Sequence, residues 1–142
     1  MATLRVSASC VDAVLKRVLG ASVSAVRAGV ENKRASISVT KLLTFTFKLW
    51  CDEPNPGRRL RIHYEGSLGS GVVLAFARKR ILEALPFVEK IQDGECVIDL
   101  EKIEISGKRL SDCIDVDAIQ MPAADDFCTI QFSIKENATC PS

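Results

Sequence analysis

The sequence has little of what catalytic proteins usually need. Histidine, tryptophan and tyrosine each occur only once in its 142 residues. General acid–base or nucleophilic catalysis most often uses a histidine beside an orienting partner. His63 instead alternates with arginines in a strand-like segment, where a surface position is the simpler interpretation. We therefore predict no catalytic residue. A small enzyme that uses His63 or a cysteine beside a carboxylate stays an alternative.

Long apolar runs are also missing. Spanning a bilayer takes about 18 or more consecutive apolar residues, and no stretch approaches that length. The first five residues do not open a secretory signal, because no basic start leads into an apolar core. We expect a cytoplasmic protein that has at most peripheral contact with membranes.

Metal-binding spacings are absent, although the chain has six cysteines. They are Cys10, Cys51, Cys96, Cys113, Cys128 and Cys140. None forms a C-x-x-C pair, whereas structural zinc sites usually gather two ligands within about two to four residues. Cys96 and Cys128 fall at apolar positions of strand-like segments, which favours buried structural thiols. We predict no metal site and no cofactor.

Net charge is small, but its distribution along the chain is uneven. The 19 basic and 18 acidic residues give +1, which favours no class of partner. Residues 1–91 carry 15 Lys or Arg and 7 Asp or Glu, whereas residues 92–142 carry 4 and 11. Either the two halves fold against each other and compensate, or a basic patch faces an anionic partner.

Two segments have the apolar pattern of helices. The first carries a stripe on a 3.6-residue period and ends near Gly20. That stripe consists of Val11, Val14, Leu15, Val18 and Leu19. The second, residues 72–85, is apolar on nearly every side in its first turns and stops before Pro86. A helix that is apolar all round is buried or covered by a partner.

The rest of the chain alternates with period two. Four such segments lie between residues 26 and 64, joined by short turns, which implies antiparallel neighbours. Three more follow the second helix and end at Ile134. We predict a single α+β domain over residues 1–142. Its highly curved antiparallel sheet of about seven strands packs on two helices, in the order helix, four strands, helix, three strands. The tail from residue 136 onward is expected to fray.

Three other patterns carry little chemistry. The glycine-rich segment 66–71 lacks the Lys-Ser/Thr ending of a phosphate loop, so a flexible linker is the simpler interpretation. Asp115 and Asp117 share a strand face, which suits either a hard cation or solvent. Basic clusters at residues 58–63 and 78–80 lack exposed aromatic residues to stack on bases, so we predict no nucleic-acid partner.

Residues 57–135 resemble the small bacterial domains of the tubular lipid-binding (TULIP-like) superfamily. The segments that carry the resemblance are Gly57–Ile62, Ile81–Pro86, Val97–Ile103, Ile114–Ile119 and Phe127–Ile134. The resemblance implies a highly curved antiparallel sheet wrapped around a long helix, with an apolar groove that holds acyl chains. That family has no strict functional residues, so no position here inherits a role.

The leading hypothesis is a non-enzymatic binding module for a lipid or other apolar ligand held between sheet and helix. The predicted groove is lined by Phe45, Phe47, Val72, Val73, Phe76 and Phe132. An anionic head group is expected to meet Arg59, Arg61, Arg78 and Arg80. The alternative is a structural protein that homo-oligomerises through the apolar helix or an edge strand.

Overall fold

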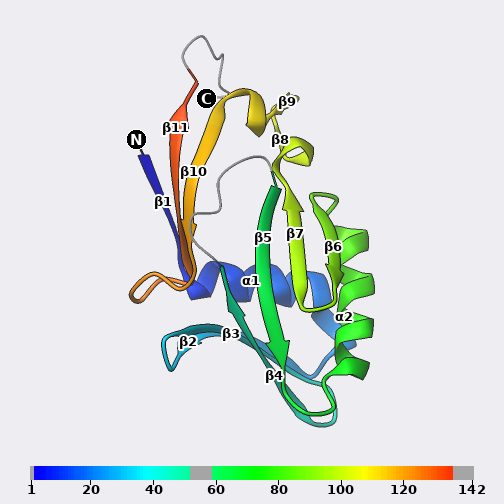
Figure 1. Cartoon of the computed structure of the whole chain (residues 1–142). Coiled ribbons are helices and arrows are strands. Elements are labelled where there is room, and N and C mark those ends of the chain that lie inside the picture. The colour runs from blue at the N-terminus through cyan, green and yellow to red at the C-terminus, as the bar shows by residue number, and fades with distance from the viewer. Residues whose placement is uncertain (1, 52–58, 136–142) are drawn as a thin grey trace.

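The computed structural model describes residues 2–51 and 59–135, which form two helices, two antiparallel sheets and a two-stranded ribbon (Figure 1). The helices are α1 (Ala8–Leu19) and α2 (Gly71–Ala84). The larger sheet consists of β2 (Ala25–Glu31), β3 (Arg34–Thr40), β4 (Thr44–Trp50), β5 (Arg59–Gly66), β6 (Val88–Gln92) and β7 (Glu95–Asp99). The smaller sheet consists of β1 (Ala2–Val6), β10 (Ile114–Gln120) and β11 (Cys128–Ile134), and the ribbon of β8 (Glu104–Ile105) and β9 (Lys108–Arg109).

Helix α1 ends at the glycine that the sequence predicts, and a serine caps its start. The Ser7 hydroxyl caps it by accepting a hydrogen bond of 3.2 Å from the Cys10 backbone amide. Gly20 ends it with a φ of 38°, a conformation that favours glycine. Leu15 and Leu19 of the apolar stripe are buried.

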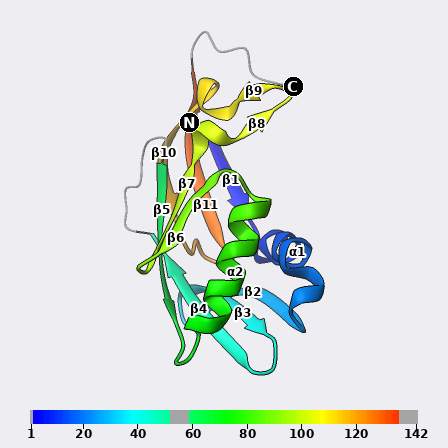
Figure 2. The same cartoon turned by 90° about the vertical axis from the view of Figure 1, so that its right-hand side faces the viewer.

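The six-stranded sheet has the order β2-β3-β4-β5-β7-β6, so the four strands predicted between the helices are neighbours in chain order. Asn32 and Lys33, with φ of 50° and 61°, form the two-residue turn between β2 and β3. Both helices cover one face of this sheet, and Figure 2 shows α1 and α2 side by side there. The core between them contains Leu15, Leu19, Val26, Val39, Phe47, Val73 and Ala77.

The three-stranded sheet has the order β1-β11-β10 and pairs strands from the two ends of the described chain. Ala2 lies opposite Phe132, and Val6 lies opposite Cys128. A second apolar cluster joins this sheet to the larger one. Its buried members are Ala28, Ala35, Ile62, Met121, Phe127 and Cys128.

The α+β composition and the antiparallel pairing agree with the sequence, but the prediction of one highly curved sheet of about seven strands is wrong. The described strands divide between two sheets, and neither sheet is strongly curled. The prediction also missed β1 and β6. A bulge between Val88 and Lys90 hides the period of β6, because it places the buried Val88 and Ile91 three residues apart. In β1 most side chains are exposed, so no apolar alternation marks it.

Three further predictions concern the segment after β7, the turn before β5 and the C-terminal tail. The apolar positions of residues 96–100 and 103–105 are out of phase, which predicts a bulge or bend near Glu101-Lys102. The structure has a 3₁₀ turn at Leu100–Lys102. The predicted turn at residues 52–57 and the tail from residue 136 lie outside the described residues. Within the described part of the chain, no helix is long and apolar enough to cross a membrane.

Candidate functional site

An apolar groove of about 270 Å³ opens at one end of the molecule, between the β3–β4 turn, the β5–α2 loop and the first turns of α2. All three segments lie at the lower end of the molecule in Figure 1. The groove is lined by Lys41, Leu42, Leu43, Phe45, Gly69, Val72, Val73 and Phe76. It therefore contains four of the residues that the sequence predicted to bind an apolar ligand.

Local structure places these side chains. Alternation along β4 turns Phe45 to the same face as Phe47, toward the helices. On α2, Val73 forms a buried floor with 4% of its surface exposed, whereas Val72 is 84% exposed at the rim. Gly69 has a φ of 81°, and an added Cβ there would lie 3.4 Å from the Phe45 ring. Glycine thus lets the loop turn closely over the groove.

Two cations flank the aromatic ring at the rim. Lys41 Nζ lies 4.5 Å from the centroid of the Phe76 ring, and Arg80 Cζ lies 5.6 Å from it. Both distances lie within the range in which a cation is attracted to a ring face. The Ser24 hydroxyl donates a hydrogen bond of 2.9 Å to the Lys41 carbonyl oxygen, which anchors the turn. The site thus combines apolar walls with positive charge at its edge.

A second hollow lies deeper, between both helices and the six-stranded sheet. It measures about 150 Å³, and its exposed walls are apolar. Its lining includes Leu19, Phe47, Leu74, Arg78 and Ile81. Apolar cavities of about this size stay dry and accept molecules no larger than benzene. This cavity is too small to hold a whole lipid chain.

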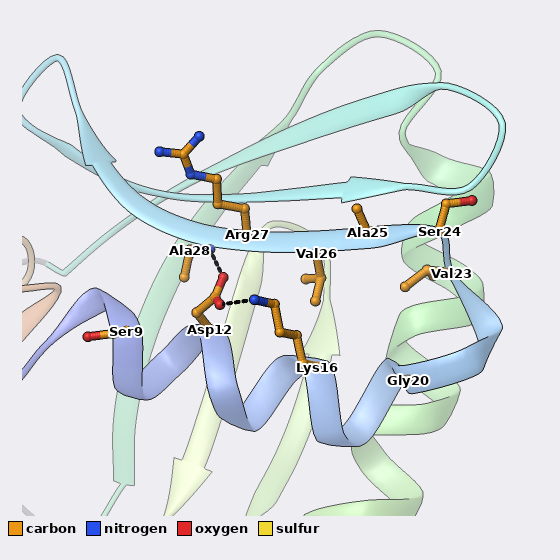
Figure 3. Close-up of a pocket in the computed structure, with 10 residues that line it drawn as sticks. All are labelled: Ser9, Asp12, Lys16, Gly20, Val23, Ser24, Ala25, Val26, Arg27 and Ala28. Carbon is orange, nitrogen blue, oxygen red and sulfur yellow. Dashed lines mark hydrogen bonds and ion pairs between the residues drawn. The ribbon is translucent and has the colours of Figure 1, made fainter.

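A wider cleft, about 730 Å³, runs between α1 and β2 (Figure 3). The Asp12 carboxylate crosses it, accepting a hydrogen bond of 3.0 Å from the Ala28 backbone amide and lying 2.7 Å from Lys16 Nζ. These two contacts, the one to Lys16 first, lower the pKa of Asp12. Asp12 therefore ties the helix to the sheet edge, and this cleft is not the candidate ligand site.

The structure brings together some predicted ligand residues and separates others. Phe45, Val72, Val73 and Phe76 line the groove, and Arg80 flanks Phe76. Phe47 and Arg78 instead line the cavity beneath.

Arg59, Arg61 and Phe132 lie elsewhere. Arg59 lies 3.0 Å from Glu89, and Arg61 lies 3.7 Å from Glu95. Both arginines are exposed, because strand alternation turns them away from the face that buries Leu60 and Ile62. Phe132 belongs to the three-stranded sheet, opposite Val116 and Ala2.

Sequence reasoning missed Lys41, Leu42, Leu43 and Gly69 as site residues. The signal that could have found them is the pair Leu42-Leu43, which breaks the polar–apolar alternation between two strands. Two apolar residues at a turn have no sheet face to fill, and here Leu42 is 95% and Leu43 68% exposed.

The groups considered for catalysis or metal binding have other surroundings than the groove. The His63 ring stacks on Trp50 at 5.7 Å between centroids, and Arg34 lies 4.6 Å above the same Trp50 ring. Burial raises the pKa of the Cys96 and Cys128 thiols to about 11, which disfavours the nucleophilic thiolate. Among the described residues, no group of three or more His, Cys, Asp or Glu could hold a metal ion.

The two predicted strand-face aspartates do not share a cation site. Asp117 accepts a hydrogen bond of 2.6 Å from the Ser133 hydroxyl, while Asp115 lies 3.7 Å from Lys135 Nζ. A bulge between Val116 and Ala118 separates their positions on β10. Each carboxylate thus makes a separate contact from β10 to the end of β11.

No protein-family model, curated protein or solved structure matches the chain. The groove is therefore defined by its own geometry. An apolar pocket with cations at its rim can hold a molecule that joins an apolar chain to an acidic group.

Proposed function

We propose that the protein is a non-enzymatic binding module that holds the apolar part of an anionic, amphipathic molecule such as a fatty acid. The observation that carries this proposal is the placement of Lys41 and Arg80 beside the Phe76 ring, which lines an otherwise apolar groove.

The size and lining of the groove support an apolar chain as the occupant. Sites for drug-sized molecules measure about 300–1,000 Å³, so a groove of about 270 Å³ suits one short chain or ring. Transfer of apolar surface from water contributes about 25 cal/mol per Å². An apolar chain in contact with Phe45 and Val73 would gain this free energy of transfer, and no polar wall would lose its contact with water.

The rim supports an acidic head group. A lysine ammonium has three donors and an arginine guanidinium has five, so contact with the Phe76 ring leaves donors available. A carboxylate or phosphate ester near Lys41 would accept charge-assisted hydrogen bonds. The predicted resemblance to tubular lipid-binding domains points to the same class of ligand.

Fluorescence titration with a pyrene-labelled fatty acid and with its methyl ester tests the proposal. We expect saturable binding of both, with tighter binding of the acid. The double variant Lys41→Gln/Arg80→Gln should weaken binding of the acid about threefold to tenfold and leave the ester unchanged, because exposed ion pairs contribute up to about 1 kcal/mol each. Arg59→Gln, an exposed arginine on the far face of the sheet, is the matched control and should bind both as the wild type does.

Two results would contradict the proposal. One is the absence of saturable binding to either probe. The other is native mass spectrometry that detects no retained ligand together with equal affinity for acid and ester.

A further inference from the structure

Four large apolar side chains stand in solvent at the end of the molecule that carries the groove. We call them the apolar tip: Leu42 (95% exposed), Leu43 (68%), Leu68 (100%) and Val72 (84%). They come from the β3–β4 turn, the β5–α2 loop and the first turn of α2. Both views place these segments together, at the end opposite the β8–β9 ribbon (Figures 1 and 2). Clustered exposed leucines usually mark a surface that another phase or partner covers.

Two basic residues lie close to the apolar tip. Lys41 belongs to the β3–β4 turn itself, beside Leu42, and lines the groove. Lys41 Nζ and Arg80 Cζ lie 4.5 Å and 5.6 Å from the centroid of the Phe76 ring, which also lines the groove. The apolar tip therefore has positive charge next to it.

We propose that the apolar tip docks onto an anionic lipid bilayer. Leu42, Leu43 and Leu68 would enter the boundary between head groups and acyl chains, where exposed apolar side chains are transferred out of water. Lys41, next to Leu42 in the same turn, and Arg80, beside the Phe76 ring, would then lie at the level of the lipid head groups. Anionic lipids attract such basic residues.

Charge favours a bilayer over a second copy of the chain. A two-fold interface at the apolar tip would bring Lys41 and Arg80 of one copy near those of the other, and like charges across an interface oppose association. A bilayer that contains phosphatidylserine offers both the apolar phase and the opposite charge. This docking does not require that the groove hold a ligand.

Co-sedimentation with phosphatidylcholine vesicles, with and without phosphatidylserine, tests the proposal. We expect the wild type to bind the vesicles that contain phosphatidylserine, to bind the neutral ones much less, and to dissociate as salt is raised. Leu42→Asp and Leu68→Asp should each weaken binding about tenfold or more. Both side chains are almost fully exposed, so thermal melts of these variants should match the wild type.

Leu4→Asp provides the matched control, because Leu4 is an exposed leucine of β1 in the other sheet. It should leave vesicle binding unchanged. Leu68 does not line the groove, so Leu68→Asp should keep the affinity for the pyrene-labelled fatty acid in solution. Loss of vesicle binding alone thus separates docking from ligand binding.

Three results would overturn the docking proposal. The first is a wild type that binds neither kind of vesicle. The second is vesicle binding that survives Leu42→Asp and Leu68→Asp. The third is a protein that does not bind vesicles and that sediments as a dimer, with Leu68→Asp restoring the monomer. A second copy of the chain would then cover the apolar tip.

Discussion

The Asp12 carboxylate of α1 accepts a 3.0 Å hydrogen bond from the Ala28 amide of β2. Strand β2 lies at an edge of the six-stranded sheet, so this amide points away from its neighbour β3. Exposed amides on an edge strand can pair with another chain. Asp12 occupies one of them, and α1 thus protects this edge against the edge-strand association considered from the sequence.

Removing this contact should loosen the helix and expose the edge. We expect Asp12→Ala to lower the melting temperature by several degrees and to increase association at high protein concentration. Lys16→Gln removes only the ion pair and should have a smaller effect, because exposed pairs within a helix contribute little. Differential scanning calorimetry and light scattering measure the two effects. If Asp12→Ala has the melting temperature and light scattering of the wild type, the contact of Asp12 with Ala28 neither stabilises the fold nor prevents association at the β2 edge.

The same contact predicts a dependence on acid. Lys16 and the Ala28 amide lower the pKa of Asp12 in the folded chain, so its carboxylate contributes stability above its ordinary pKa of 3.8. That contribution is lost as the pH falls through the lower, folded value. We expect the difference in melting temperature between the wild type and Asp12→Asn to shrink between about pH 6 and pH 3. A difference that stays constant over this range would show that the charge is not involved.

Cysteine reactivity should separate exposed from buried thiols. Burial raises the pKa of Cys96 and Cys128 to about 11, so at about pH 8 few of these thiols are ionised. Iodoacetamide should label the exposed Cys10 before Cys96 and Cys128, as peptide mass spectrometry can follow. Labelling of Cys128 should require unfolding by urea. Equal labelling rates in the folded protein would contradict the burial of these strands.

A raised thiol pKa also predicts sensitivity to alkali. The folded state holds these protons more tightly than the unfolded chain, so stability is fully present below the ordinary thiol pKa of 9.0 and falls as the pH rises toward about 11. Urea melts at increasing pH should therefore show a falling midpoint. Cys96→Ala should reduce the slope, and Cys10→Ala, at an exposed position, should not.

Two glycines near the groove should respond oppositely to alanine. A Cβ at Gly66 would overlap the Ser70 hydroxyl and lie 2.9 Å from the Phe47 ring, so Gly66→Ala should destabilise by about 1–3 kcal/mol. A Cβ at Gly71 would meet nothing within 4 Å, and Gly71 is the first residue of α2. Gly71→Ala should therefore stabilise by up to about 1 kcal/mol, because alanine favours helix. Chemical denaturation measures both, and a stable Gly66→Ala protein would contradict the close packing under the loop.

Strict patterns in the sequence predicted much of the fold. The stripe ending at Leu19 predicted α1, and the alternation around Phe45 and Phe47 predicted β4, because a side chain's direction follows from its position in a regular element. The same alternation does not say which strands are neighbours. The pairing of β1 with β11 joins residues from opposite ends of the chain and leaves no local signal.

The groove was predictable where apolar residues exceeded the needs of one helix face. The first turns of α2 are apolar on more than one side, and Val72 indeed lies at the rim while Val73 forms the floor. The sequence predicts Arg59 at the same groove, but its side chain lies on the face of β5 that points away from the helices. Sequence alone does not show that the basic face of β5 and the apolar face of α2 are far apart. Lys41 was missed because turn residues follow no period, and its position depends on how β3 and β4 meet α2.

The β1–β11 pairing sets an order of assembly during synthesis on the ribosome. Ala2–Val6 is made before every other described strand, yet it must wait for its partner Cys128–Ile134, the last of them. Until then the nascent polypeptide can assemble the helices and β2 to β7. The apolar side chains that pack against the smaller sheet stay uncovered during this time. During that interval these uncovered side chains are open to association with other chains.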